Sequence, residues 1–170
     1  LNFFGGHPTE LTHAIVARAH AILLADSEAA MAATSPDAAF ERVVEACVLL
    51  SGLAFESGGL SIAHSMVRGF STVPELAGLL HGEMVALGTL TQIAAGQGDA
   101  DELRALAAFF RRLGLPTSFA DFGLTDEAVF ARMAEISLGA PYATNFLRKL
   151  SATDLVQAMR LVDAVETGND

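Results

Sequence analysis

Residues 9–23 read TELTHAIVARAHAIL, and the spacing of their apolar side chains decides the fold class. The apolar positions recur every three or four residues, which is the period of one face of an α-helix. They are Leu11, Ile15, Ala19, Ile22 and Leu23. Thr9 directly follows Pro8 and is of the residue type that caps helix N-termini. No stretch of the chain alternates apolar and polar residues with β-branched enrichment, so we predict an all-α helical bundle.

A second helix is expected to begin at Ser35-Pro36, which pairs an N-cap residue with a proline at the first helical position. After Glu45 this helix is apolar on most of its sides, so we expect it to lie centrally. The glycines at 58–59 should end it. Its apolar stripe consists of Phe40, Val43, Val44, Cys47, Leu50 and Leu53.

Further helices are indicated by caps and apolar periodicity along the rest of the chain. Asp99 with Glu102, and Ser151 with Asp154, have the spacing of capping boxes. Residues 69–80 are expected to be irregular. The remaining helices are expected at 60–68, from His81 onward, at 100–112, from Thr125 onward and at about 151–166, with fraying at 167–170.

Composition excludes several classes of function. The 170 residues suit a single domain. Lys and Arg number 10 against 20 Asp and Glu, and the resulting charge of −10 argues against nucleic acid and anionic membranes as partners. Apolar residues make up 52%, which argues against disorder. A long apolar run at 46–55 falls short of the roughly 18 residues that a membrane span requires.

The start of the chain suggests a piece of a larger protein. The first residue is Leu1 and the first methionine is Met31. No basic segment followed by an apolar stretch indicates a signal peptide, and we expect a cytoplasmic protein. The single cysteine excludes an internal disulfide framework and a CxxC motif. We therefore expect residues 1–170 to be one helical domain that is truncated at its N-terminus.

Five histidines are the candidates for chemistry: His7, His13, His20, His64 and His81. His13 and His20 are seven residues apart on one face of the first helix, and no third ligand of obvious spacing lies near them. We interpret this pair as partly exposed helix residues rather than metal ligands.

His64 and His81 are the stronger candidates. His64 lies among small and apolar residues, and His81 begins a helix. A neutral imidazole in apolar surroundings is a good ligand for Zn²⁺ or Fe²⁺, and two histidines on adjacent elements can bind one ion. Spacing alone still favours a structural role, so both interpretations remain open at this point.

Two motifs around these histidines resemble a known family. They are SGLAFESGGLSIAH at 51–64 and HGEMVALGTLTQ at 81–92. Both resemble the glycerol dehydrogenase branch of the iron-containing alcohol dehydrogenase superfamily, and their histidines fall at the separation seen in that family. The resemblance extends more weakly to Gly5-Gly6 and to residues 113–116.

The resemblance implies a metal-dependent NAD enzyme. Family members combine an N-terminal nucleotide-binding α/β domain with a C-terminal helical domain, and the active site lies between the two. A zinc or iron ion is held there by one aspartate and two histidines, which His64 and His81 match. The aspartate lies upstream of the family segment that this chain covers. The implied reaction oxidises a secondary alcohol through a metal alkoxide, with hydride transfer to NAD⁺.

Two further residues have alternative interpretations. Phe55 belongs to the first motif and is a candidate for a wall of the substrate pocket, but it could equally be a plain core residue. Glu83 could bind His81 as a supporting partner or complement the N-terminus of its own helix, and we favour the helix terminus.

The sequence thus favours the C-terminal part of an NAD-dependent glycerol or other polyol dehydrogenase, which is inactive without its cofactor domain and third metal ligand. By resemblance it should form homo-oligomers through its helical domain. Two alternatives stay open. One is a non-catalytic helical oligomerisation or interaction domain derived from such an enzyme. The other is a relative of dehydroquinate synthase, which the residues around Phe55 and Leu87 make less favourable.

Overall fold

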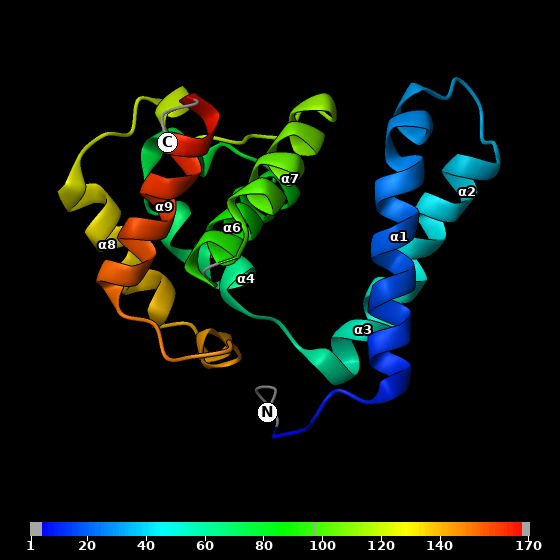
Figure 1. The fold of residues 1–170 in the computed structure, drawn as a ribbon, viewed down its shortest axis with the longest axis horizontal. Helices are drawn as coiled ribbons and strands as arrows, with labels where there is room; N and C mark the ends of the chain where they lie inside the picture. Colours follow the sequence, from blue (N-terminus) through cyan, green and yellow to red (C-terminus); the bar gives the residue numbers. More distant parts are fainter. Residues whose placement is uncertain (1–4, 97, 168–170) are drawn as a thin grey trace. The chain divides into compact units, whose positions relative to one another are not determined.

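The computed structural model describes residues 5–96 and 98–167, and every regular element in them is helical (Figure 1). The prediction of an all-α protein is therefore confirmed. Contacts divide the chain into two compact units, Leu1–Gly59 (unit 1) and Leu60–Asp170 (unit 2). The expected fraying at 167–170 falls mainly outside the described residues.

Unit 1 is a pair of helical arms. Helix α1 spans Glu10–Ala32, and its N-cap is Thr9 as predicted, with the Thr9 hydroxyl accepting from the Thr12 backbone N–H at 3.2 Å. The return arm runs without interruption through three segments. These are α2 (Ala38–Glu45), the π-helical segment η1 (Ala46–Leu50) and α3 (Ser51–Gly58).

The predicted start of the return arm at Ser35-Pro36 is wrong. The N-cap is Asp37, whose carboxylate accepts from the Phe40 backbone N–H at 2.9 Å. Aspartate caps as well as serine does, and Pro36 then precedes the cap instead of occupying the first turn. The guanidinium of Arg42 joins the two arms by donating two hydrogen bonds of 2.7 Å to the Asp26 carboxylate.

The return arm does not lie centrally, which corrects a second prediction. Its apolar positions face several directions, and in the described chain Val48 is 74% exposed. Ala46 is the only residue of α2, η1 and α3 that is buried. The return arm is apolar on most of its sides, and its large side chains are nevertheless exposed or only partly buried.

Unit 2 begins with α4, which spans Ile62–Phe70 instead of 60–68. The segment expected to be irregular contains one short helix. The elements after α4 are α5 (Pro74–Ala77), α6 (His81–Ala95), α7 (Ala100–Arg112), η2 (Ala120–Phe122), α8 (Glu127–Leu138), η3 (Pro141–Thr144) and α9 (Ala152–Thr167).

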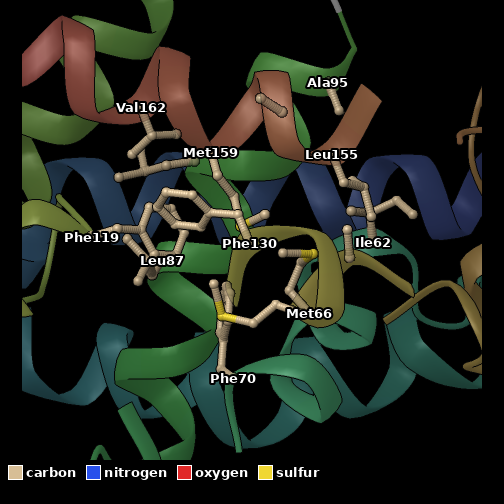
Figure 2. Packing of buried hydrophobic residues seen from close by; sticks show 14 of the residues in the cluster. Ile62, Met66, Phe70, Leu87, Ala95, Phe119, Phe130, Leu155, Met159 and Val162 are labelled. Carbon is tan, nitrogen blue, oxygen red and sulfur yellow. The ribbon is translucent and has the colours of Figure 1, made fainter. Parts of the chain in front are cut away.

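The core of unit 2 forms where α4 packs on α6 and α8, and α9 packs on α6 and α8 (Figure 2). The Phe119 ring packs edge-to-face against both Phe70 and Phe130, at centroid distances of 5.6 Å each. All three rings are fully buried. Such aromatic contacts add to the stabilisation from buried area alone. This core fixes α4 against α6, the two helices that carry the candidate site.

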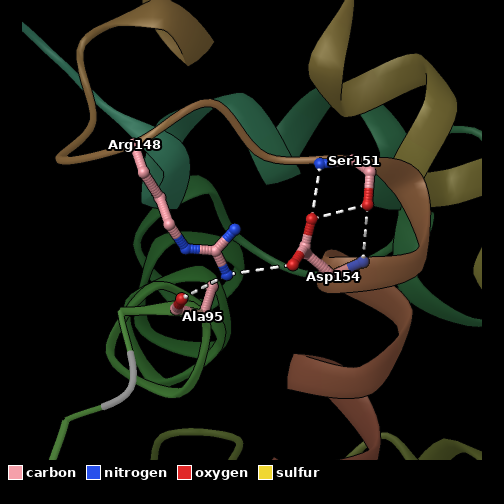
Figure 3. A network of polar contacts seen from close by, with 4 residues as sticks. All are labelled: Ala95, Arg148, Ser151 and Asp154. Carbon is pink, nitrogen blue, oxygen red and sulfur yellow. Dashed lines mark hydrogen bonds and ion pairs between the residues drawn. The ribbon is translucent and has the colours of Figure 1, made fainter.

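The start of α9 is held by a polar network (Figure 3). Ser151 and Asp154 form the predicted capping box, with the Ser151 backbone N–H donating to Asp154 at 2.7 Å and the Asp154 N–H donating to the Ser151 hydroxyl at 3.2 Å. Arg148 donates both to Asp154 at 2.9 Å and to the Ala95 carbonyl at 3.3 Å. Hydrogen bonds from Ser151, and then from Arg148, hold the pKa of Asp154 well below its usual range.

Among the described residues, no single helix is both long and apolar enough to cross a membrane. The consecutive stretches Ala38–Gly58 and Ile62–Phe70 meet the length and composition criteria only when they are taken together.

Candidate metal centre

The two histidines of the sequence motifs lie side by side in unit 2. His64 is in the first turn of α4, and His81 is the first residue of α6. Their ring centroids are 5.5 Å apart, and the ring planes are inclined by 52°. The structure therefore brings together two side chains that are separated by a loop and a short helix in the sequence.

This separation fits two imidazoles that share one metal ion. With tetrahedral zinc and Zn–N distances of about 2.0–2.1 Å, two bound imidazoles have ring centroids roughly 5 Å apart. His64 is partly buried and His81 is exposed. Burial lowers the pKa of His64, and the neighbouring charge of His81 lowers it further. A lowered pKa favours the neutral imidazole, which is the form that binds metals.

The described part of the chain places two candidate ligands together, without a third beside them. In residues 5–96 and 98–167, no group of three or more His, Cys, Asp or Glu side chains is placed to hold an ion. A structural or catalytic zinc site usually has at least three protein ligands. The pair alone therefore has fewer protein ligands than such a site.

The backbone that leads to His64 is anchored at several points. Gly59 ends α3 with a φ of +72°, a conformation that favours glycine. The Asn145 side chain donates to the Leu60 carbonyl at 2.9 Å. The backbone N–H of Ala63 donates to the side-chain oxygen of Gln92 at 2.9 Å. Sequence reasoning assigned no role to Asn145 or Gln92, although Gln92 is the last residue of the second motif.

Glu83 acts at the start of its own helix, as we favoured. Its carboxylate accepts from the Leu80 backbone N–H at 2.7 Å, which satisfies a donor at the N-terminus of α6. The acidic group in this first turn also complements the helix dipole.

The other candidate residues belong to unit 1, whereas the histidine pair belongs to unit 2. Phe55 is on α3 in unit 1 and is 46% exposed, so the interpretation as a core phenylalanine is wrong. His7, His13 and His20 are exposed. The interpretation of His13 and His20 as surface residues of the first helix is confirmed.

Comparisons with known proteins identify the relatives of this chain. No family model matches. A glycerol dehydrogenase of Escherichia coli O6:H1 is 36% identical over 126 residues, which is 72% of this chain and 34% of that protein. The chain is homologous to glycerol dehydrogenases. The resemblance to glycerol dehydrogenases that the two histidine motifs indicate is therefore confirmed.

Two other similarities agree with this homology. A glycolaldehyde reductase of Halobacterium salinarum is 38% identical over 129 residues, 74% of this chain and 35% of that protein. The solved structure of a probable glycerol dehydrogenase from Sinorhizobium meliloti matches with a TM-score of 0.87 and 33% identity, covering 93% of this chain and 46% of that chain. The chain thus spans about a third of the length of the first two curated relatives named here, at 34% and 35%.

Proposed function

We propose that this chain is the C-terminal, metal-binding part of an NAD-dependent glycerol or polyol dehydrogenase. One observation carries the proposal. In a chain homologous to glycerol dehydrogenases, the histidines of its two specific motifs meet with ring centroids 5.5 Å apart.

In this proposal His64 and His81 hold a divalent ion, Zn²⁺ or Fe²⁺, together with an aspartate from a segment upstream of this chain. The ion, when bound, would lower the pKa of a substrate hydroxyl and so favour hydride transfer to NAD. His64 contributes a neutral imidazole because burial lowers its pKa. The exposure of His81 leaves one side of the pair open to an approaching alcohol.

The substrate class follows from the relatives, which are dehydrogenases of glycerol and a reductase of glycolaldehyde. Both compounds are small and carry neighbouring oxygen atoms, so we propose glycerol or another small polyol. We further propose that Phe55 forms part of the pocket wall and that NAD binds to a separate α/β domain. Assembly into homo-oligomers and a cytoplasmic location complete the proposal.

The proposal is tested in the complete protein by His64→Ala and His81→Ala. Each should abolish reduction of NAD with glycerol, because only two of the three proposed protein ligands then remain. His13→Ala and His20→Ala are matched controls, since both side chains are exposed on α1 and should leave the rate unchanged. A wild-type rate in either variant of the pair would refute the metal assignment.

The exposed apolar side chains of unit 1 favour a second candidate function, a non-catalytic interaction domain. Met31 is 73% exposed and Leu11 is 69% exposed, and several other large apolar side chains of unit 1 are exposed with them. Exposed apolar surface that forms a large patch marks an interaction site. This alternative predicts that the wild-type complete protein does not reduce NAD with glycerol and still self-associates. Turnover by the wild-type protein would exclude it.

A further inference from the structure

We infer that Gln92 is a positioning residue that sets the placement of His64 relative to His81. The inference concerns the geometry of the histidine pair, and its consequence for metal binding rests on the proposed function. It joins three observations on α4 and α6. Two are contacts at Ala63, the residue directly before His64, and the third is the position of His81 on α6.

The first observation is the hydrogen bond from the Ala63 backbone N–H to Gln92, at 2.9 Å. Backbone N–H groups in the first turn of a helix have no partner within that helix. The N-cap residue Ser61 uses its hydroxyl to donate to the Asn145 carbonyl. The donor at Ala63 is therefore satisfied by a side chain from another helix, α6.

The second observation is a close backbone approach at the same residue. A Cβ atom added at Gly88 would lie 2.4 Å from the Ala63 carbonyl oxygen, well inside contact distance. Glycine at this position thus allows α6 to pack directly on the backbone of Ala63. Gly88 and Gln92 are four residues apart and share one face of α6.

The third observation is the register of His81 on that helix. His81 precedes Gly88 by seven residues, so His81, Gly88 and Gln92 lie along one stripe of α6. One face of α6 therefore carries three features. His81 is the candidate metal ligand, Gly88 contacts the Ala63 carbonyl, and Gln92 accepts from the Ala63 N–H. Because His64 follows Ala63 directly, this stripe fixes the distance between the two imidazoles.

Asn145 anchors the same start of α4 from a different element. It donates to the Leu60 carbonyl from the residue after η3, and it is not part of the helix that carries His81. Asn145 thus holds the backbone before α4 without reference to His81. Gln92 holds the start of α4 against α6, the helix that carries His81. Binding sites need their ligands placed to within about 0.5 Å, so loss of this register should weaken an ion held by both rings.

The test uses the complete protein with Co²⁺ as the probe, because its absorption spectrum reports ligand geometry. Gln92→Met keeps the side-chain length and removes the acceptor. We expect Co²⁺ to bind about tenfold more weakly with an altered visible spectrum, in line with losses at other groups that support metal ligands. Gln92→Glu retains an acceptor for the Ala63 N–H and should restore the wild-type spectrum. Gln157→Met is the matched control, since Gln157 is exposed on α9.

A second measurement separates this inference from the proposed function. The crystal structure of metal-free Gln92→Met should show the ring centroids of His64 and His81 moved from their 5.5 Å separation. An unchanged separation, a wild-type Co²⁺ affinity in Gln92→Met, or no rescue by Gln92→Glu would overturn the inference. If His64→Ala and His81→Ala bind Co²⁺ as the wild type does, the proposed function fails instead, and the crystal structure alone decides the role of Gln92.

Discussion

Unit 1 and unit 2 are both helical, yet they bury their apolar residues to very different extents. In the described part of unit 1, Ile22 and Ala46 are the buried apolar residues. Unit 2 buries three phenylalanines in mutual contact, together with many large aliphatic side chains. Helical periodicity therefore identifies a helix in both units, whereas only the three-dimensional contacts reveal which helices build a core.

The difference also separates the functional candidates. His64, His81 and Gln92 belong to the well-packed unit, where α4 and α6 are fixed by the core beneath them. Phe55 belongs to the unit with exposed apolar side chains. We therefore expect the histidine pair to be sensitive to core substitutions in unit 2 and insensitive to surface substitutions in unit 1.

The largest expected contrast between the units comes from a matched pair of phenylalanines. Phe119→Ala removes a fully buried ring that contacts two others and should lower the free energy of unfolding by about 3–5 kcal/mol. Phe40→Ala in unit 1, where the side chain is 38% exposed, should cost less than about 1 kcal/mol. Urea denaturation of the 170-residue chain measures both. Equal losses would contradict the difference in burial.

A pair of glycines should give effects of opposite sign. Gly88→Ala places a methyl group 2.4 Å from the Ala63 carbonyl oxygen and should destabilise unit 2 by about 1–3 kcal/mol. Gly52→Ala in α3 meets no atom within 4 Å and should stabilise unit 1 by about 0.5–1 kcal/mol. Thermal unfolding checks the two signs. Stabilisation by Gly88→Ala would show that α4 and α6 are not in backbone contact.

The smallest expected effect is one that both units should share. Hydrogen bonds from Ser151 and Arg148 lower the pKa of Asp154, and the hydrogen bond from Arg42 lowers the pKa of Asp26. A carboxyl whose folded pKa is lowered stabilises the fold above its unfolded pKa, which is about 3.9 for aspartate, and this contribution is lost as the pH falls further.

The melting temperatures of Asp154→Asn and Asp26→Asn should therefore lie below that of the wild type at pH 7. Both differences should shrink as the pH falls below about 4. Thermal unfolding of the three proteins across this range provides the measurement. A difference that stays constant with pH would mean that neither carboxylate draws its stabilising effect from its charge.

Sequence reasoning succeeded where local chemistry decides the outcome. Thr9 caps the N-terminus of α1, and Ser151 with Asp154 caps that of α9. Both caps were predictable because each involves only residues a few positions apart. It failed at Ser35-Pro36 because Asp37 offers an equally good cap two residues later. The π-helical turn of η1 interrupts a continuous apolar pattern that carries no signal for it.

Part of the candidate site was also predictable, because its two histidines stand in short sequence motifs. His64 and His81 stand in motifs that a family resemblance reveals, and the fold brings their rings together. The bond between Ala63 and Gln92 joins residues 29 positions apart in the chain, so no local pattern indicates it. Phe55 was assigned to a core or a pocket wall, and its 46% exposure excludes the core assignment.

The central claim is that His64 and His81 bind the same metal ion. Anomalous X-ray scattering at the zinc edge, from a crystal of the complete protein grown with zinc, locates the ion directly. The account predicts one peak per chain, about 2.0–2.1 Å from a ring nitrogen of His64 and from a ring nitrogen of His81. A peak that contacts neither ring, or only one of them, would contradict it.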